Sequence, residues 1–196
     1  IMTLMPSYCF HGLPGSIMVS KYGTRFADEA ANYHVFNRYF EAHDSGADHN
    51  EQVWPGYLIV DAKHTAAYGP LMPNEGESSS FDSLEELAQA VGIDYKNLSW
   101  QIEQFNSFAE QGYDPQFMRG ESIWDKRYCE NNGGDYAAAQ PNVSMAPVKE
   151  PPFEVVAVYP SVLTVRGGLK TNGKAQVIAR TGEVIKGLYA SGSWDT

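Results

Sequence analysis

The chain has 196 residues, with 14 Lys and Arg side chains against 24 Asp and Glu, so its formal net charge is −10. This acidity argues against a nucleic-acid-binding protein, whose basic face must neutralise phosphates. No apolar run reaches the roughly 20 residues that cross a bilayer, so no integral membrane segment is expected. Hydrophobic residues at 43% and aromatic residues at 13% predict a soluble globular protein with a substantial core.

Charge and cysteine content vary along the chain. Residues 51–150 hold 16 of the acidic side chains, whereas residues 151–196 are slightly basic. The two cysteines, Cys9 and Cys129, are too few for a disulfide framework and predict reduced thiols in a cytoplasm. The five histidines show no metal-binding spacing, so no metal site is expected.

The predicted elements begin with a short strand over residues 16–21 and a turn over residues 22–24. Apolar residues at helical spacing predict a helix over residues 27–40. The continuous apolar run at residues 57–60 predicts a buried strand, and the Pro, Gly and Ser content of residues 70–80 predicts a loop.

The strongest local signal is a helix that begins after Ser83. Ser83 and Glu86 have the spacing of a capping box, and Gly92 is typical of a helix end. A second helix is predicted over residues 97–111, with Gly112 as its stop, so that the two helices form a hairpin.

The C-terminal half is predicted to change in character. Poor periodicity over residues 112–152 indicates irregular structure. Strands are predicted over residues 153–159 and 175–179, and a short buried strand over residues 188–192. The fold class expected from these elements is α+β, a mixed body followed by a β-rich tail that belongs to another domain.

No single motif identifies a chemistry, since nucleophile elbows, P-loops and the GxGxxG pattern are all missing from these 196 residues. Five groups of residues in order along nearly the whole chain nevertheless resemble one superfamily, that of soluble fumarate reductase and 3-ketosteroid Δ1-dehydrogenase. They are GTRFADE at 23–29, WPGYLIVD at 54–61, the LEELA, GID and FN residues between 84 and 106, DPQFMRG at 114–120, and the GGLKT, QVI and IKGLYASG residues between 167 and 192. Asp28 stands where the resembled pattern usually has Asn.

The resemblance implies a two-domain flavoenzyme with FAD as its cofactor. Residues 1–20 would be a strand leaving the FAD domain, residues 21–150 the cap or substrate domain, and residues 151–196 β-rich strands of a Rossmann-like FAD domain. The dinucleotide-binding glycines would precede Ile1, and the turn that covers the flavin would follow Thr196. Contacts with FAD are expected from Gly167, Gly168, Ala190, Gly192 and Ser193.

In the ketosteroid branch the resembled motif continues to a tyrosine that abstracts the proton beside the ring carbonyl, and RFADEAANY places Tyr33 at that position. Desaturation of a ketone removes this proton and passes a hydride from the β carbon to flavin N5, so a base in a dry pocket is required. The expected substrate is a small apolar ketone or steroid-like molecule, and the electron acceptor is unknown. His34, Tyr57 and Thr164 are expected in the substrate pocket.

Other interpretations stay open. Tyr33 is alternatively a core aromatic, and Arg25 with Glu29 is expected to form a structural ion pair. Fumarate or enoate reduction is disfavoured, because Leu163 and Thr164 replace the paired histidines of that branch and its proton-donating arginine is missing at residues 63–65. A cap domain that only binds or scaffolds, without catalysis, is the third function considered.

Overall fold

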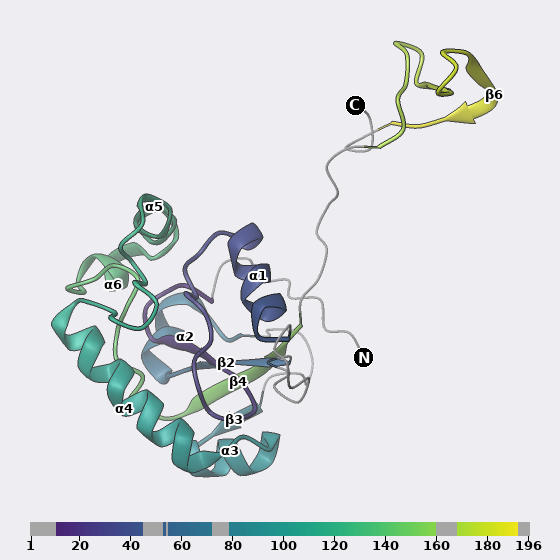
Figure 1. Ribbon diagram of the computed structural model, residues 1–196. Coiled ribbons are helices and arrows are strands. Elements are labelled where there is room, and N and C mark those ends of the chain that lie inside the picture. Colours follow the sequence, from purple (N-terminus) through teal and green to yellow (C-terminus); the bar gives the residue numbers. More distant parts are fainter. Residues whose placement is uncertain (1–10, 45–52, 54, 72–78, 160–167, 192–196) are drawn as a thin grey trace. The chain divides into compact units, whose positions relative to one another are not determined.

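The computed structural model describes residues 11–44, 53, 55–71, 79–159 and 168–191. The chain divides into two compact units, Ile1–Pro160 and Ser161–Thr196 (Figure 1). The mixture of helices and strands confirms the expected α+β class. None of the helices in the described ranges is both long and apolar enough to cross a membrane.

The first unit is built on a four-stranded antiparallel sheet in the order β1-β2-β4-β3. Its strands are β1 (Ser16–Val19), β2 (Gly56–Val60), β3 (Ser79–Phe81) and β4 (Phe153–Val158). The segments predicted at residues 16–21, 57–60 and 153–159 are therefore strands. Because β4 lies between β2 and β3, the first unit extends beyond residue 150.

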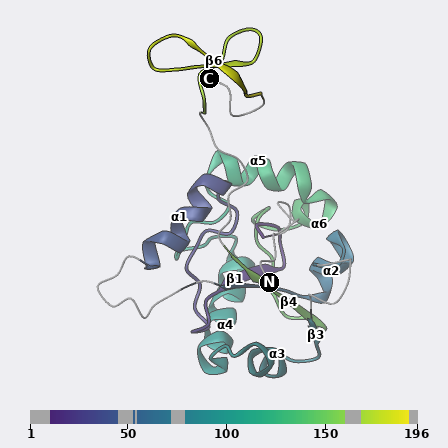
Figure 2. The same cartoon turned by 90° about the vertical axis from the view of Figure 1, so that its right-hand side faces the viewer.

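Successive side chains of these strands point to opposite faces of the sheet and divide the core in two. Ile17, Ile59 and Val155 lie side by side in one cluster, which α3 and α4 cover. Met18, Leu58 and Val156 lie in the other cluster, which α1 covers. The alternation thus places α1 on the opposite side of the sheet from α3 and α4 (Figures 1 and 2).

Six helices surround this sheet in the described residues of the first unit. They are α1 (Tyr33–Asp44), α2 (Ala62–Tyr68), α3 (Leu84–Val91), α4 (Tyr95–Gln111), α5 (Ile123–Asn132) and α6 (Gly134–Ala138). The predicted hairpin is confirmed, because Ser83 Oγ accepts the N–H of Glu86 and Gly92 ends α3 in the left-handed region. Asp94 caps α4 and Gly112 ends it.

Three sequence predictions differ from the structure. The first predicted helix begins at Tyr33 rather than residue 27, because Asp28 and Asn32 hold residues 28–32 in turns. Ser79 and Ser80 are in a strand rather than a loop, since the neighbouring β4 supplies their pairing partners. Residues 112–152, predicted to be irregular, contain the helices α5 and α6. A capping box of Ser122 and Asp125 marks the start of α5.

The second unit contains an antiparallel hairpin of β5 (Gln176–Ile178) and β6 (Val184–Tyr189). The turn at residues 181–182 is present, with Gly182 at a φ of +88°. The prediction of a buried strand at residues 188–192 is wrong for the described residues of β6. This strand is exposed along its whole length, and Tyr189 is 62% exposed. Within the described part of this unit, β6 pairs with β5 and no second layer covers its apolar side chains.

Candidate functional site

The turn after β1 is held by a buried ion pair. The Nη2 atom of Arg25 lies 2.6 Å from Oε2 of Glu29, and Nε lies 3.0 Å from Oε1. Both side chains are fully buried. The expected structural ion pair is therefore confirmed, and the N–H of Met18 adds a hydrogen bond to Glu29 that ties the pair to β1.

The same pair is joined by residues from a distant motif. Asp114 binds the other edge of the Arg25 guanidinium, at 2.9 and 3.1 Å, and Arg119 lies 3.2 Å from Glu29. Arg119 also donates to the carbonyls of Leu13 and Ser16 at 2.9 Å. Two groups of residues that the sequence places about 90 positions apart thus form one buried network.

Aromatic rings enclose the two guanidinium groups. Arg25 lies 5.0 Å from the ring centres of both Phe105 and Phe117, and Arg119 lies 5.5 Å from that of Phe105. The rings exclude water and attract the cations through their negative faces. Glu29 holds the network together because its two arginine neighbours keep its pKa below the ordinary value despite burial.

Two motif glycines make close contacts that only glycine allows. Gly23 has a φ of +76°, and an added Cβ would lie 2.6 Å from the Asp94 oxygen and the Leu98 nitrogen at the start of α4. Gly120 has a φ of +84°, and its Cβ would lie 2.0 Å from the Asn142 side chain. The missing side chains therefore allow the backbone at Gly23 to lie against the start of α4 and the backbone at Gly120 to lie against Asn142.

The network leads directly into α1. Asp28 Oδ1 accepts the N–H of Ala30 at 2.9 Å, and the Asp28 carbonyl accepts that of Ala31 at 3.2 Å. Asn32 Oδ1 then accepts the N–H of Val35, the hydrogen bond of a helix N-cap. Tyr33 is consequently the first residue of α1, at a backbone position set by this turn.

Aromatic contacts fix the rest of α1 on the sheet. Phe40 packs edge-on against Phe26 and Phe36, with ring centres 5.1 and 5.6 Å apart. His11 stacks on Phe36 at 4.6 Å and on Tyr128 of α5 at 6.4 Å. Burial lowers the pKa of His11, so that the ring is neutral near pH 7.

Of the residues predicted for the pocket, Tyr57 lies away from α1. Tyr57 packs on the α3 and α4 face, across the sheet from α1, and its hydroxyl donates to the Val91 carbonyl at 3.3 Å. Burial raises its pKa. The side chains of Tyr33 and His34 lie outside the described part, as does Thr164.

The predicted cofactor contacts belong to the second unit. Gly168 is exposed, and Ala190 is half-buried and donates its N–H to the Ala175 carbonyl at 2.9 Å. The remaining three predicted contacts, Gly167, Gly192 and Ser193, lie outside the described residues.

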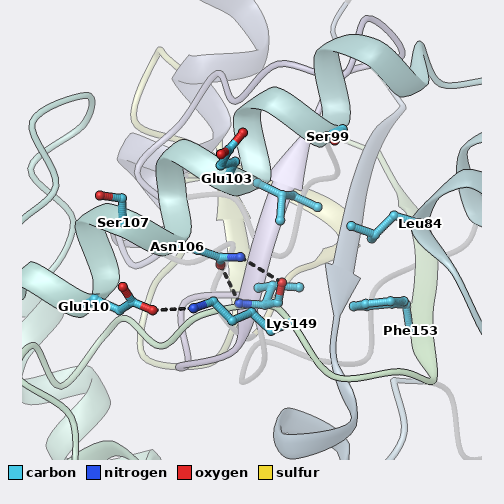
Figure 3. Close-up of a pocket in the computed structure, with 10 residues that line it drawn as sticks. Leu84, Ser99, Glu103, Asn106, Ser107, Glu110, Lys149 and Phe153 are labelled. Carbon is cyan, nitrogen blue, oxygen red and sulfur yellow. Dashed lines mark hydrogen bonds and ion pairs between the residues drawn. The ribbon is translucent and has the colours of Figure 1, made fainter.

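A groove lies between α4, the start of α3 and residues 148–153 (Figure 3). Asn106 forms its floor by accepting the Val148 N–H at 2.7 Å and donating to the Val148 carbonyl at 3.1 Å. Glu110 pairs with Lys149 at its rim, and Glu103 points into the open space. This acidic lining does not fit the pyrophosphate of a dinucleotide.

The described residues of the second unit include uncovered backbone and exposed positive charge. Gly182 and Gly187 have positive φ angles, and an added Cβ at either would meet no atom within 4 Å, so the backbone there is uncovered. Lys170, Lys174 and Lys186 are exposed on this unit and supply positive charge.

Asp114 and Arg119 were not predicted as members of the network, although the sequence around them contains a signal for buried charge. The segment DPQFMRG was recognised as a motif without a role for its charged ends. A charged residue between Met118 and Gly120, in an apolar context, indicates a buried and paired side chain. Arg119 is 0% exposed.

Comparisons with known proteins identify a family and several relatives. A family model described as "FAD binding domain" matches residues 10–194. The chain is 35% identical to 4-oxocyclohexanecarboxylate 2-dehydrogenase of Sinomonas cyclohexanicum, covering 92% of this chain and 31% of that protein. It is 31% identical to 3-oxosteroid 1-dehydrogenase of Mycobacterium tuberculosis, covering 92% and 33%.

The fold has a solved counterpart. The 3-ketosteroid Δ1-dehydrogenase of Sterolibacterium denitrificans, in complex with 1,4-androstadiene-3,17-dione, matches with a TM-score of 0.73 and 30% identity over 96% of this chain and 34% of that one. A flavocytochrome c3 fumarate reductase shares the fold, with a TM-score of 0.60 and 22% identity over 92% of this chain and 27% of that one. The chain spans about a third of the length of the curated relatives. The match over residues 10–194 shows that the chain belongs to the FAD binding domain family, a family of flavoprotein oxidoreductases with FAD as cofactor.

Proposed function

We propose that the protein is an FAD-dependent dehydrogenase that desaturates a CH–CH bond beside a ring ketone, with Tyr33 as the base. The observation that carries this proposal is the backbone position of Tyr33, which follows the Asn32 cap of α1 and a turn anchored on the Arg25–Glu29 pair. The names of two relatives, 4-oxocyclohexanecarboxylate 2-dehydrogenase and 3-oxosteroid 1-dehydrogenase, both denote ring ketones. The substrate class proposed is therefore an apolar cyclic ketone, with steroids at the large end.

The chemistry places one requirement on this chain. When bound, FAD supplies the acceptor for the hydride that leaves the β carbon. A base must take the α proton, and a tyrosine with an ordinary pKa of about 10 needs help to do so. Tyr33 begins α1, at the end of the helix where the dipole favours negative charge. This position supports the role of its phenolate.

Reduction of an enoate is the second candidate in the same family, and the fold shared with a fumarate reductase is compatible with it. That reaction needs cations that clamp the carboxylates of the substrate. Arg25 and Arg119 are both engaged with buried carboxylates. Lys63 pairs with Glu150 at the surface, at 2.6 Å. These pairings favour the ketone over the dicarboxylate.

In this proposal the substrate is held by the first unit from residue 21 onward, including β4, and the second unit, from Ser161, is part of the FAD side. His34 and Thr164 remain proposed pocket residues. Tyr57 is not included, because its ring packs across the sheet from α1. A polypeptide that binds or scaffolds without catalysis remains the alternative.

The test is an anaerobic titration of the purified full-length protein that carries these residues. Addition of 3-oxosteroid or of 4-oxocyclohexanecarboxylate is expected to bleach the visible flavin absorbance, and a desaturated ketone should appear in equal amount. Fumarate or acrylate added to chemically reduced protein should leave the flavin reduced. Protein that cannot be reconstituted with FAD would contradict both enzymatic functions, and rapid reoxidation by an enoate would favour the second.

A further inference from the structure

The buried network contains more acids than bases. Two arginines and four carboxylic acids lie together, and none of these residues is more than 7% exposed. They are Arg25, Arg119, Asp28, Glu29, Asp114 and Asp125. With every group ionised, the carboxylates would exceed the guanidinium groups by two negative charges. Because an uncompensated buried charge is strongly unfavourable, the environment of each acid decides where the excess is removed.

Three of the four acids have several donors. Glu29 and Asp114 each accept two hydrogen bonds from Arg25 and further ones from backbone N–H groups. Asp125 accepts from the N–H groups of Gly120 and Ser122 and from the Ser122 hydroxyl. Asp125 also lies in the first turn of α5, where the helix dipole favours a carboxylate. Hydrogen bonds and the arginine charges therefore lower the pKa of Glu29 and Asp114 despite their burial, and the Asp125 carboxyl group has three hydrogen-bond donors.

Of the four acids, Asp28 has the fewest hydrogen-bond donors to stabilise an ionised carboxylate. In the part of the chain that the structure describes, its carboxyl group accepts one hydrogen bond, from the Ala30 N–H. Burial and, to a smaller extent, the carboxylates of Asp125 and Glu29 raise the pKa of Asp28 to about 7, although the Ala30 N–H and the more distant Arg119 act in the opposite direction. Asp28 is thus the acid that keeps its proton when the others are ionised.

Groups from every neighbouring element face this carboxyl group. Asp125 comes from α5, Arg119 from the segment before it and Glu29 from the same turn. Tyr39 comes from α1, and the Asp28 backbone hydrogen-bonds its phenol. The pKa of Tyr39 is raised by burial and then by Asp28, so the phenol is neutral and adds no positive charge.

A second titratable group, the Cys129 thiol of α5, is also neutral. Burial raises its pKa to about 11, and the charges of Asp125 and Asp28 contribute to the rise. Among the neighbouring groups in the described structure, Arg119 is the cation that acts on Asp28. The two side chains are too far apart to form a hydrogen bond there. Within the described residues, these groups supply no second cation that could replace the proton of Asp28.

We propose that Asp28 is a positioning residue held as a neutral carboxylic acid, which fixes the turn from which α1 and Tyr33 start and loosens this turn when it ionises. The neutral acid has the shape of the Asn that usually occupies this position in the resembled motif. Its side chain holds Ala30, its carbonyl holds Ala31, and its backbone contacts Tyr39 in the middle of α1. The catalytic consequence rests on the proposed function of Tyr33, whereas the protonation itself does not.

The first test compares Asp28→Asn with wild type and with Asp82→Asn, an exposed acid outside the network. The folded state holds the Asp28 proton to a higher pH than the unfolded chain. The stability that it confers is therefore full at low pH and is lost as pH rises toward 7. Asp28→Asn cannot ionise, so its unfolding equilibrium constant relative to wild type should fall by at least about tenfold between pH 4.5 and pH 8. Asp82→Asn should show no such change.

The second test observes the proton directly. Wild-type protein at about pH 5.5 should show the infrared C=O stretching band of a buried carboxylic acid, and this band should disappear at about pH 8.5. The band should be missing in Asp28→Asn and present in Asp82→Asn. Because the wild-type measurement needs no variant, it remains decisive if Asp28→Asn does not fold. A band that is absent in wild type, or unaffected in Asp28→Asn, would overturn the inference.

The third test measures turnover of the ring ketone against pH. In wild type, kcat should fall above about pH 7 with KM nearly unchanged, whereas Asp28→Asn should keep its kcat over the same range. A fall in both proteins would contradict the positioning role. If neither protein oxidises a ring ketone, the proposed function fails, while the infrared and unfolding measurements still decide the state of Asp28.

Discussion

Arg25 and Glu29 form a bidentate, fully buried ion pair across one turn of the chain, with the shorter N–O distance at 2.6 Å. The pair joins the residues before α1 to β1 through Met18 and to Asp114 through the far edge of the guanidinium. The motif residues at 23–29 and at 114–120 therefore have a structural role. They set the path of the backbone that leads to Tyr33.

Replacement of Arg25 should lower the stability of the folded protein. Arg25→Met leaves Glu29 and Asp114 with reduced compensation, and we expect the free energy of unfolding to fall by about 3–5 kcal/mol in urea titrations. Arg25→Lys should recover little of this loss, because a lysine cannot bind both carboxylates in a fork geometry. Lys126→Met is the control, since its partner Glu121 lies 4.0 Å away at the surface. A loss that is equal in the two methionine variants would contradict the role of the network.

Gly23 should not tolerate a side chain. Gly23→Ala is strained by its φ of +76° and drives a Cβ to 2.6 Å from backbone atoms of α4. Gly92→Ala has the same φ of +76° and meets no atom within 4 Å, so it carries the strain alone. We expect about 1 kcal/mol of destabilisation for Gly92→Ala and at least about 2 kcal/mol more for Gly23→Ala in thermal or urea unfolding. Equal losses would show that the close approach to α4 is unimportant.

His64 should make the protein less stable in acid. Its Nδ1 donates to the Pro14 carbonyl at 2.8 Å, and burial lowers its pKa from 6.5 to about 4. The unfolded chain takes up a proton below pH 6.5 that the folded protein refuses, so stability is full above this pH and falls by up to about 3 kcal/mol toward pH 4. His64→Gln lacks this group. Its unfolding free energy should therefore fall less steeply between pH 6.5 and pH 4, as measured by urea titration at each pH.

Tyr33→Phe should lose the chemistry and keep the fold. Removal of the phenol is expected to lower kcat for the ring ketone by about a hundredfold or more, as for the loss of a general base, with FAD content unchanged. Tyr95→Phe is a matched control, since Tyr95 is the first residue of α4 as Tyr33 is of α1 and is 41% exposed. Full turnover of Tyr33→Phe in stopped-flow flavin reduction would remove the base assignment.

Local patterns in the sequence predicted much of the secondary structure. The capped helix after Ser83, the helix ending at Gly112 and the strand around residues 57–60 follow from caps and apolar periodicity, which act between near neighbours. The start of α1 was predicted six residues too early. Its apolar residues have helical spacing, but the hydrogen bonds of Asp28 and Asn32 compete with the helix.

The candidate site was predicted only in part. The motif residues and the position of Tyr33 came from the sequence, and Arg25 and Glu29 of the first motif were expected to form a structural ion pair. The participation of Asp114 and Arg119 was not, because no local rule links residues about 90 positions apart. Tyr57 belongs to a strand that was correctly predicted, but only the sheet pairing shows which face carries its ring.

The sequence by itself determined the capped helices α3 and α4, the strand around residues 57–60 and the family that the motifs resemble, since caps, apolar periodicity and motifs depend on residue order and near neighbours. The tertiary structure decided which charged groups meet. It brings Asp28 and Asp125 into a water-poor interior with Glu29 and Arg119, where burial and like charge raise the pKa of one acid to about 7. Local spacing contains no information about this, because electrostatic energy depends on distance and solvent exclusion in the folded chain.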